Sequence, residues 1–110
     1  MPTYARATVN FAGSNVACNP DPVPVSRATN NGVEWTANQT GYTFTGVSID
    51  GHDAPWGDFG TPQISTNAAG QSVMSVSDSV ADLGDYSYTL LYTDSAGNPG
   101  RFDPTIRNER

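Results

Sequence analysis

The alternation of apolar and polar side chains is the strongest signal along the chain, and it is clearest in residues 84–93. Tyr86, Tyr88 and Leu90 fall on one face of an extended backbone, and Tyr92 continues that face. A period of two is typical of a half-buried strand. We therefore expect a central strand here, followed by a long turn at residues 94–100, where glycine, asparagine and proline suit turn conformations.

The same period recurs in shorter segments, and glycine and proline residues lie between them. We predict further strands in the ranges 4–11, 25–28, 33–37, 42–49, 71–77 and 101–107. Many short strands joined by turns are typical of an all-β domain. Trp35 lies in the middle of one predicted strand, where Greek-key sandwiches commonly bury an aromatic side chain between their sheets. We find no amphipathic helix of usable length.

Glycine, asparagine and proline residues predict where these strands turn, bulge or lie at a sheet edge. Residues 30–32 read Asn-Asn-Gly, which predicts a tight turn between two neighbouring strands. Residues 13–15 predict another turn, and Gly46 interrupts its strand in a way that predicts a bulge. Pro22 and Pro24 lack the N–H group that a central strand needs, so we place their segment at a sheet edge. The sequence as a whole predicts an all-β fold, a single Greek-key β-sandwich of about seven strands over residues 1–110.

Composition excludes several functions. Eleven acidic residues face five arginines and no lysine, a formal net charge of −6. Because nucleic acids attract clustered positive charge, we expect no nucleic-acid partner. Cys18 is the single cysteine, so no intrachain disulfide or cysteine-rich zinc site is expected. No signal peptide or long apolar run is found, so we expect no membrane partner; taken literally this predicts a cytoplasmic location, although a leader removed earlier would leave no trace.

The strongest family likeness lies in the central strand and the turn after it. These residues resemble the cupredoxins, small copper-carrying Greek-key sandwiches, through the spacing of Gly84, Tyr86, Tyr88, Ala96, Gly97 and Gly100. At the positions of the family's copper ligands, however, this chain has Leu90, Thr93, Asn98 and Phe44. A blue-copper site needs two imidazoles, a thiolate and a weak axial ligand. The resemblance therefore implies the sandwich fold without a copper cofactor or electron transfer.

An immunoglobulin-like sandwich is the competing interpretation. The pattern Asp82-x-Gly84-x-Tyr86 resembles a tyrosine corner, in which a tyrosine hydroxyl binds the loop before its strand. Tyr88 stands where the second cysteine of such domains would lie. The ending of the chain, residues 102–109, is similar to the tail of small uncharacterised bacterial sandwich proteins, which favours a bacterial source.

Residues 50–62 form the long irregular segment of the chain, and long loops in small domains are often functional. Asp50, His52, Asp53 and Asp58 are candidate ligands for Ca²⁺ or a transition metal, although turns favour the same residue types. A metal-dependent hydrolase would use His52 beside a nucleophile such as Ser48 or Ser65. We consider this the weakest hypothesis, because neither serine lies in a known nucleophile motif.

The aromatic residues of this loop suggest a binding role. Trp56 and Phe59, together with His52, could hold a small ligand or a carbohydrate ring. The alternative, which we favour, is that the loop folds back and buries them as a lid on the core. Asp82 and Asp85 could in principle form a glycosidase pair, but their position favours a role in capping a turn.

Three functional hypotheses follow from these residues. The first is a non-enzymatic binding or assembly module, which presents the loop at 50–62 or a sheet edge to a protein partner or to copies of itself. The lack of lysine supports it, because lysine commonly protects sheet edges against pairing between chains. The second is a small-ligand or carbohydrate binder that uses Trp56, and the third is the metal-dependent hydrolase that depends on His52.

Overall fold

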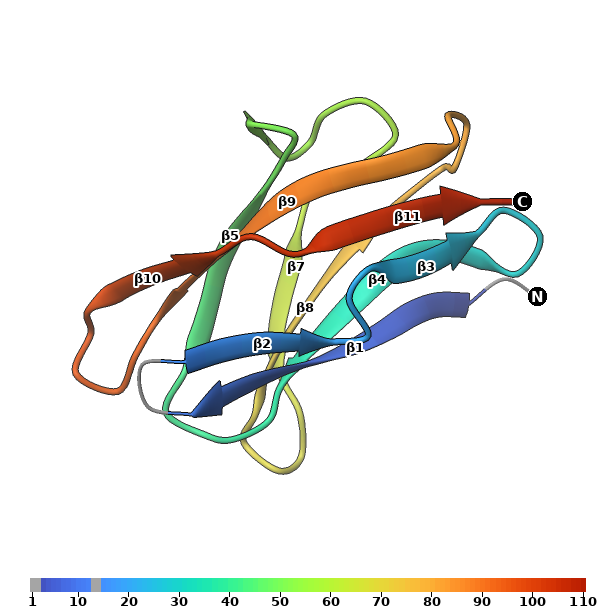
Figure 1. The fold of residues 1–110 in the computed structure, drawn as a ribbon. Helices are drawn as coiled ribbons and strands as arrows, with labels where there is room; N and C mark the ends of the chain where they lie inside the picture. The colour runs from blue at the N-terminus through green and yellow to red at the C-terminus, as the bar shows by residue number, and fades with distance from the viewer. Residues whose placement is uncertain (1–2, 13–14) are drawn as a thin grey trace.

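The chain folds into two packed β-sheets, as the alternating pattern predicts (Figure 1). The computed structural model describes residues 3–12 and 15–110, and within these residues eleven strands form and no helix does. The strands are β1 Thr3–Ala12, β2 Asn15–Asn19, β3 Val23–Ser26, β4 Asn30–Ala37, β5 Thr43–Ile49, β6 His52–Asp53, β7 Gln63–Thr66, β8 Ser72–Ser77, β9 Gly84–Thr93, β10 Pro99–Phe102 and β11 Thr105–Glu109.

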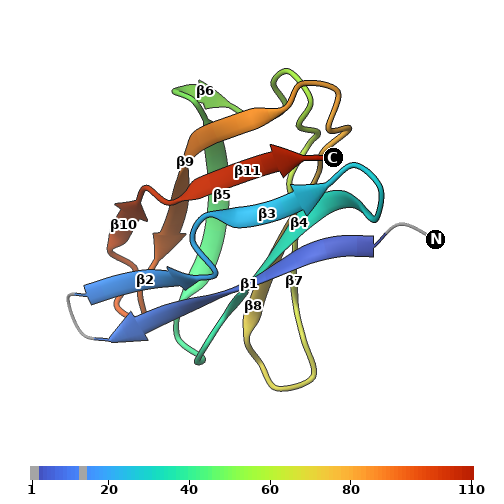
Figure 2. The ribbon, with the colours of Figure 1, turned by 45° about the vertical axis from the view of Figure 1, so that its right-hand side comes forward.

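One sheet has five strands in the order β2-β1-β4-β8-β7, and the other has six, with β3-β11-β9-β5-β6 in line and β10 beside β9. Most neighbours are antiparallel, but β1 pairs with β4, and β11 with β3, in parallel. Figures 1 and 2 show how β5, β9 and β11 form one layer while β1, β4 and β8 form the other. The Cα radius of gyration, 13.1 Å, is the value expected for a compact chain of this length.

The core lies between the two layers. Its largest fully buried side chains are Trp35, Tyr88, Phe11, Phe44, Ile49, Met74, Leu90 and Ile106. The predicted burial of Trp35 is confirmed, because none of its surface is exposed. Its indole nitrogen donates a hydrogen bond of 2.8 Å to the Tyr88 hydroxyl, so the one polar atom of the indole has a partner across the sandwich.

The central position of β9 is also confirmed. It pairs with β5 along one side, and with β10 and then β11 along the other. Tyr88 and Leu90 point into the core, as the alternation predicts. The bulge predicted at Gly46 is present as a register shift between Phe44 and Gly46. It lets Phe44 and Val47 both face the core, although they are three residues apart.

The turn predicted at residues 30–32 is wrong. These residues begin β4, and the chain instead turns at 27–29, where the Thr29 N–H donates to the Ser26 carbonyl over 3.1 Å. The Asn30 side chain accepts a hydrogen bond from the Ser26 N–H. Because β3 and β4 belong to different sheets, the connection crosses between layers instead of forming a hairpin.

The strand predicted at 101–107 is divided in two. It breaks at Asp103 and Pro104, between β10 and β11, because Pro104 has no N–H to donate. The pattern also missed the short strands β2, β6 and β7. Together with the division of the last strand, they account for the four strands beyond the expected seven. Of the turn predicted at 13–15, residues 13 and 14 lie outside the described residues.

Candidate functional site

The loop at residues 50–62 connects β5 in one sheet to β7 in the other, and it is partly folded onto the protein. It begins with a tight turn in which Asp50 has a φ of 52° and donates its N–H to the Ser87 carbonyl over 2.7 Å. The short strand β6 then pairs with the end of β5. Trp56 and Phe59 form a further bridge within the loop, and Phe59 bridges to Asp78. The loop is therefore held by backbone hydrogen bonds at several points.

The aromatic residues of the loop have different environments. Phe59 is 2% exposed and packs edge-on against Tyr86, with ring centroids 5.5 Å apart. A ring buried in this way presents almost no surface to a ligand. Trp56 is half-buried against the core, and the exposed His52 stacks on it at 4.4 Å with an interplanar angle of 9°. Burial of Phe59 and partial burial of Trp56 match the lid interpretation of this loop.

The acidic candidates for a metal site bind their own surroundings instead of one another. Asp53 accepts a hydrogen bond of 3.0 Å from the Ser48 hydroxyl, and Asp58 accepts one of 2.9 Å from the Asp82 N–H. Across residues 3–12 and 15–110, no group of three or more histidine, cysteine, aspartate or glutamate side chains lies close enough to hold a metal ion. The fold therefore does not gather Asp50, His52, Asp53 and Asp58 into one centre.

The hydrolase arrangement is not assembled either. Ser48 donates its hydroxyl proton to Asp53, whereas the His52 ring stacks on Trp56. Ser65 lies on β7, in the opposite sheet. Among the described hydrogen bonds, none joins His52 to either serine.

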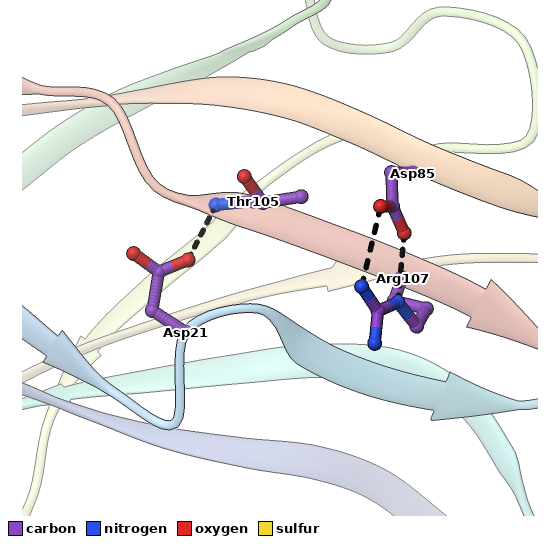
Figure 3. Close-up of polar contacts among 4 residues, drawn as sticks. All are labelled: Asp21, Asp85, Thr105 and Arg107. Carbon is purple, nitrogen blue, oxygen red and sulfur yellow. Dashed lines mark hydrogen bonds and ion pairs between the residues drawn. The ribbon is translucent and has the colours of Figure 1, made fainter.

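The acids near the start of β9 have structural partners. Asp85 accepts hydrogen bonds of 2.9 and 3.3 Å from the Arg107 guanidinium on the neighbouring strand β11, as Figure 3 shows. This hydrogen bond is the main reason that the pKa of Asp85 is lowered. The Tyr86 hydroxyl donates to the Asp82 carbonyl over 3.3 Å, which is the contact predicted from the tyrosine-corner pattern. Asp85 therefore acts through its carboxylate between two strands, whereas Asp82 acts through its backbone carbonyl.

Figure 3 also shows how β11 is held from the other side. The Thr105 N–H donates a hydrogen bond of 2.9 Å to Asp21, in the connection between β2 and β3. Asp21 thus connects the segment between β2 and β3 to the start of β11. This contact is structural and was not predicted from the sequence.

A shallow groove lies beside the loop, between β5 and β7. It has a volume of about 360 Å³ and is lined by Thr45, Gly46, Val47, Asp53, Ala54, Pro62, Ile64 and Leu91. Most of these side chains are apolar or small, and Asp53 is the one charged residue among them. The groove was not predicted, because its walls come from segments that are far apart in the sequence.

The strand β7 forms one border of this groove and is the outermost strand of its sheet. It pairs with β8 on one side, and no other strand of the described chain lies on its outer side. All four of its residues are exposed. Ile64 is 45% exposed, and with Leu83 it is one of two large hydrophobic residues that the described chain leaves exposed. Residues 60–77, which contain β7 and β8, have no charged side chain at all.

No protein-family model matches the chain, and no curated protein is significantly similar to it. In the described residues, no helix is long and apolar enough to cross a lipid bilayer. The function is therefore inferred from the residues themselves.

Proposed function

We propose that this protein is a non-enzymatic assembly module that associates with a second copy of itself through the outer edge of β7. The main support is that the outer edge of β7 has no partner strand in the described chain. A free strand edge presents N–H and C=O groups that can pair with another strand. Proteins usually prevent such pairing with lysine, with other charges, with proline or with a bulge. Residues 63–66 contain none of these.

The other sheet edges are better protected. The strand β3 contains Pro24, which has no N–H to donate, and β6 has two residues, of which Asp53 is charged. On β2, the side chains of Val16 and Cys18 pack against the core, so this edge exposes no large apolar side chain as β7 does with Ile64. We therefore place the contact at β7.

Charge explains why the partner is a second copy. The chain has a net charge of −6, so most of its surface repels an identical molecule. The uncharged run at residues 60–77 is the place where two copies can approach with the least repulsion. A strongly basic partner would instead be attracted to the acidic loops, and it would gain nothing from a neutral strand.

Antiparallel pairing of β7 with its copy would join the two five-stranded sheets into one sheet of ten. A twofold arrangement with Ile64 opposite Ile64 would cover the most exposed apolar side chain of the edge. Stable interfaces usually bury about 800 Å² on each partner, and four residues are too few for that. We therefore expect weak association that depends on concentration.

The finer fold assignment is part of the same proposal. We infer a Greek-key sandwich of the cupredoxin or immunoglobulin type, supported by the contact of Tyr86 with Asp82 and by the buried Trp35. Leu90 and Phe44, which occupy two copper-ligand positions of the cupredoxins, lie in the apolar core. This placement supports a role without copper.

The carbohydrate-binding alternative is less well supported by the geometry. One face of Trp56 is covered by His52, and Phe59 is buried. The exposed His52 ring is what remains of the aromatic platform. Titration of the tryptophan fluorescence with glycans would test this alternative directly.

Sedimentation velocity over micromolar to millimolar concentrations tests the assembly proposal. We expect the wild-type protein to shift from monomer toward dimer as its concentration rises. Ile64→Lys places a charge on the edge of β7 and should leave a monomer at every concentration. The unfolding midpoint of this variant should stay close to that of the wild type, because Ile64 is already 45% exposed.

Ala17→Lys is the matched control, because it adds the same charge at an exposed position on β2, the opposite edge of the same sheet. We expect it to dimerise like the wild type. A wild-type protein that stays monomeric at millimolar concentration contradicts the proposal. So does a dimer that Ala17→Lys disrupts and Ile64→Lys leaves intact.

A further inference from the structure

A buried polar pair joins the two sheets at the end of the sandwich near the C-terminus. Asp78 follows β8 in one sheet, and Asn108 lies on β11 in the other. They are 1% and 2% exposed. The Asn108 amide donates a hydrogen bond of 3.3 Å to Asp78 Oδ1. Few polar side chains of the described chain are as deeply buried, and buried polar atoms usually have hydrogen-bond partners.

Most of the hydrogen-bonding groups in this pair have partners. Asp78 Oδ1 also accepts from the Val80 N–H over 2.9 Å, and Asn108 Nδ2 also donates to the Asp82 carbonyl over 3.1 Å. Two atoms are left over: Asp78 Oδ2 and Asn108 Oδ1 are buried and have no partner. Both are acceptors when the aspartate is ionised, so neither can satisfy the other.

Exchanging the oxygen and nitrogen of the Asn108 amide would not satisfy every polar atom of the pair. The exchange would turn its oxygen toward the Asp82 carbonyl and Asp78 Oδ1, which are also acceptors. It would thus create two new unfavourable contacts while removing one. The observed orientation of the amide is therefore the better one.

We propose that Asp78 takes up one proton from solvent on Oδ2 and donates it to Asn108 Oδ1, so that the two side chains close a cyclic acid–amide pair between the sheets. A carboxylic acid and a primary amide match in this way, each with one donor and one acceptor. A single proton thus satisfies both leftover oxygens. No other bond forms or breaks, and the carboxylate becomes a neutral acid.

The surroundings of Asp78 favour this neutral form. Burial is the main cause that raises its pKa to about 6, and the nearby carboxylate of Asp58 adds to the shift. Asp82 is an acidic residue of the following loop, and its backbone carbonyl accepts a hydrogen bond from Asn108. Arg27, from the turn between β3 and β4, is the nearby cation, and its guanidinium donates hydrogen bonds of 2.9 Å to the Val80 and Ala81 carbonyls.

The remaining titratable groups around the pair lie on β9 and β11. The pKa of Tyr86 is raised by burial and then by acids that include Asp58, Asp82 and Asp78, so this tyrosine stays neutral near neutral pH. Arg107 and Glu109 flank Asn108 in the chain and are exposed on the outer face of β11. None of these groups offers Asp78 a buried positive partner.

The sign of the pH effect follows from the direction of the shift. The pKa of Asp78 is higher in the folded chain than in the unfolded chain, so the pair stabilises the fold most at low pH. Its contribution to the folding equilibrium constant falls about tenfold per pH unit between about pH 4 and about pH 6, and it levels off above about pH 7. This end of the sandwich is therefore closed more firmly under mildly acidic conditions.

Asp78→Asn tests the pair, because an asparagine has the shape and hydrogen-bonding pattern of a protonated aspartate. The unfolding equilibrium constants of wild type and variant are measured by chemical denaturation across the pH range. We expect their ratio to rise about 100-fold between about pH 4 and about pH 7 and then to stay constant. Asp82→Asn is the matched control. It removes a neighbouring charge but leaves the backbone carbonyl that Asn108 binds, so its ratio to wild type should change far less.

Two direct measurements complete the test. The carboxyl carbon of Asp78, followed by NMR, should titrate well above the ordinary range for aspartate. Titration near the ordinary pKa, or a ratio that does not change with pH, would overturn the proposal. Calcium is added in a separate experiment, and stabilisation of wild type by Ca²⁺ that Asp78→Asn abolishes would also overturn it, because the two oxygens would then be cation ligands.

Discussion

At the scale of single residues, the polar groups of the buried Trp35 and Tyr88 side chains have partners on the opposite sheet. Tyr88 on β9 accepts the indole hydrogen bond of Trp35 and lies 3.5 Å from the Cys18 sulfur. Burial raises the pKa of the Tyr88 hydroxyl far above its usual value, and it also raises that of the Cys18 thiol. Both groups therefore stay neutral at physiological pH. A neutral, half-buried thiol is a weak nucleophile, which favours a structural role for Cys18.

The stabilities of Tyr88→Phe and Tyr86→Phe show how much the buried hydrogen bond to Trp35 stabilises the fold. Each variant removes one hydroxyl. Tyr88→Phe leaves the Trp35 N–H buried without a partner, so we expect a loss of about 1–3 kcal/mol in the free energy of unfolding. Tyr86→Phe removes a longer, exposed contact and should cost less than about 1 kcal/mol. Chemical denaturation measures both losses. Equal losses would mean that the contact with Trp35 adds nothing beyond an ordinary surface hydrogen bond.

At the scale of elements, close packing between strands decides residue choices that a local pattern assigns to turns. Gly32 looks like the glycine of an Asn-Gly turn, yet it lies in β4 between β1 and β8. A Cβ atom there would lie 2.5 Å from the Val76 carbonyl oxygen and 3.0 Å from the Tyr4 ring. The carbonyl belongs to the backbone of the neighbouring strand and cannot move alone. The glycine is needed for space.

Gly32→Ala should therefore destabilise the protein although alanine is a small residue. We expect a loss of about 1–3 kcal/mol, the usual cost of overpacking a well-filled interior. Asn31→Ala, at the exposed neighbouring position of the same strand, is the control and should change the stability by less than about 0.5 kcal/mol. Thermal and chemical unfolding provide the measurement. If both variants behave alike, β4 and β8 are less closely packed than described.

At the scale of the whole molecule, charge and sheet topology act together. Negative charge is concentrated in the loops, while the β7–β8 side is neutral over residues 60–77. This separation leaves the neutral edge as the surface least opposed to contact between copies. It also predicts how salt acts on that contact, because the remaining acids of two copies repel each other through solvent.

Self-association should become stronger as salt is added. Raising the ionic strength to about 0.1 M shortens the screening length to about 10 Å, which weakens the repulsion between two acidic molecules. We expect the dissociation constant of the dimer to fall several-fold between low and moderate salt, as measured by sedimentation equilibrium. A dissociation constant that rises with salt would indicate an interface built from opposite charges, and it would place the contact away from β7.

Local sequence patterns suffice where the two faces of a strand differ clearly. The strands with clean alternation, β1 and β9 above all, were predicted closely, because the two faces of a strand are set by neighbouring residues. The bulge at Gly46 and the contact of Tyr86 with Asp82 were predicted for the same reason. The turn at 30–32 was wrong, because its Asn-Gly signal does not reveal that Gly32 packs against another strand. The strand β7 was missed because both of its faces are exposed.

The sequence by itself determined the all-β character, the inward faces of the long strands and the excess of negative charge, since these depend on residue type and period alone. Tertiary structure alone decided which edge stays unpaired, which loop acids find partners and which two polar side chains meet between the sheets. Asp78 and Asn108 are thirty residues apart in the chain and belong to opposite layers. A contact of that kind depends on how two sheets stack, and no local period records it.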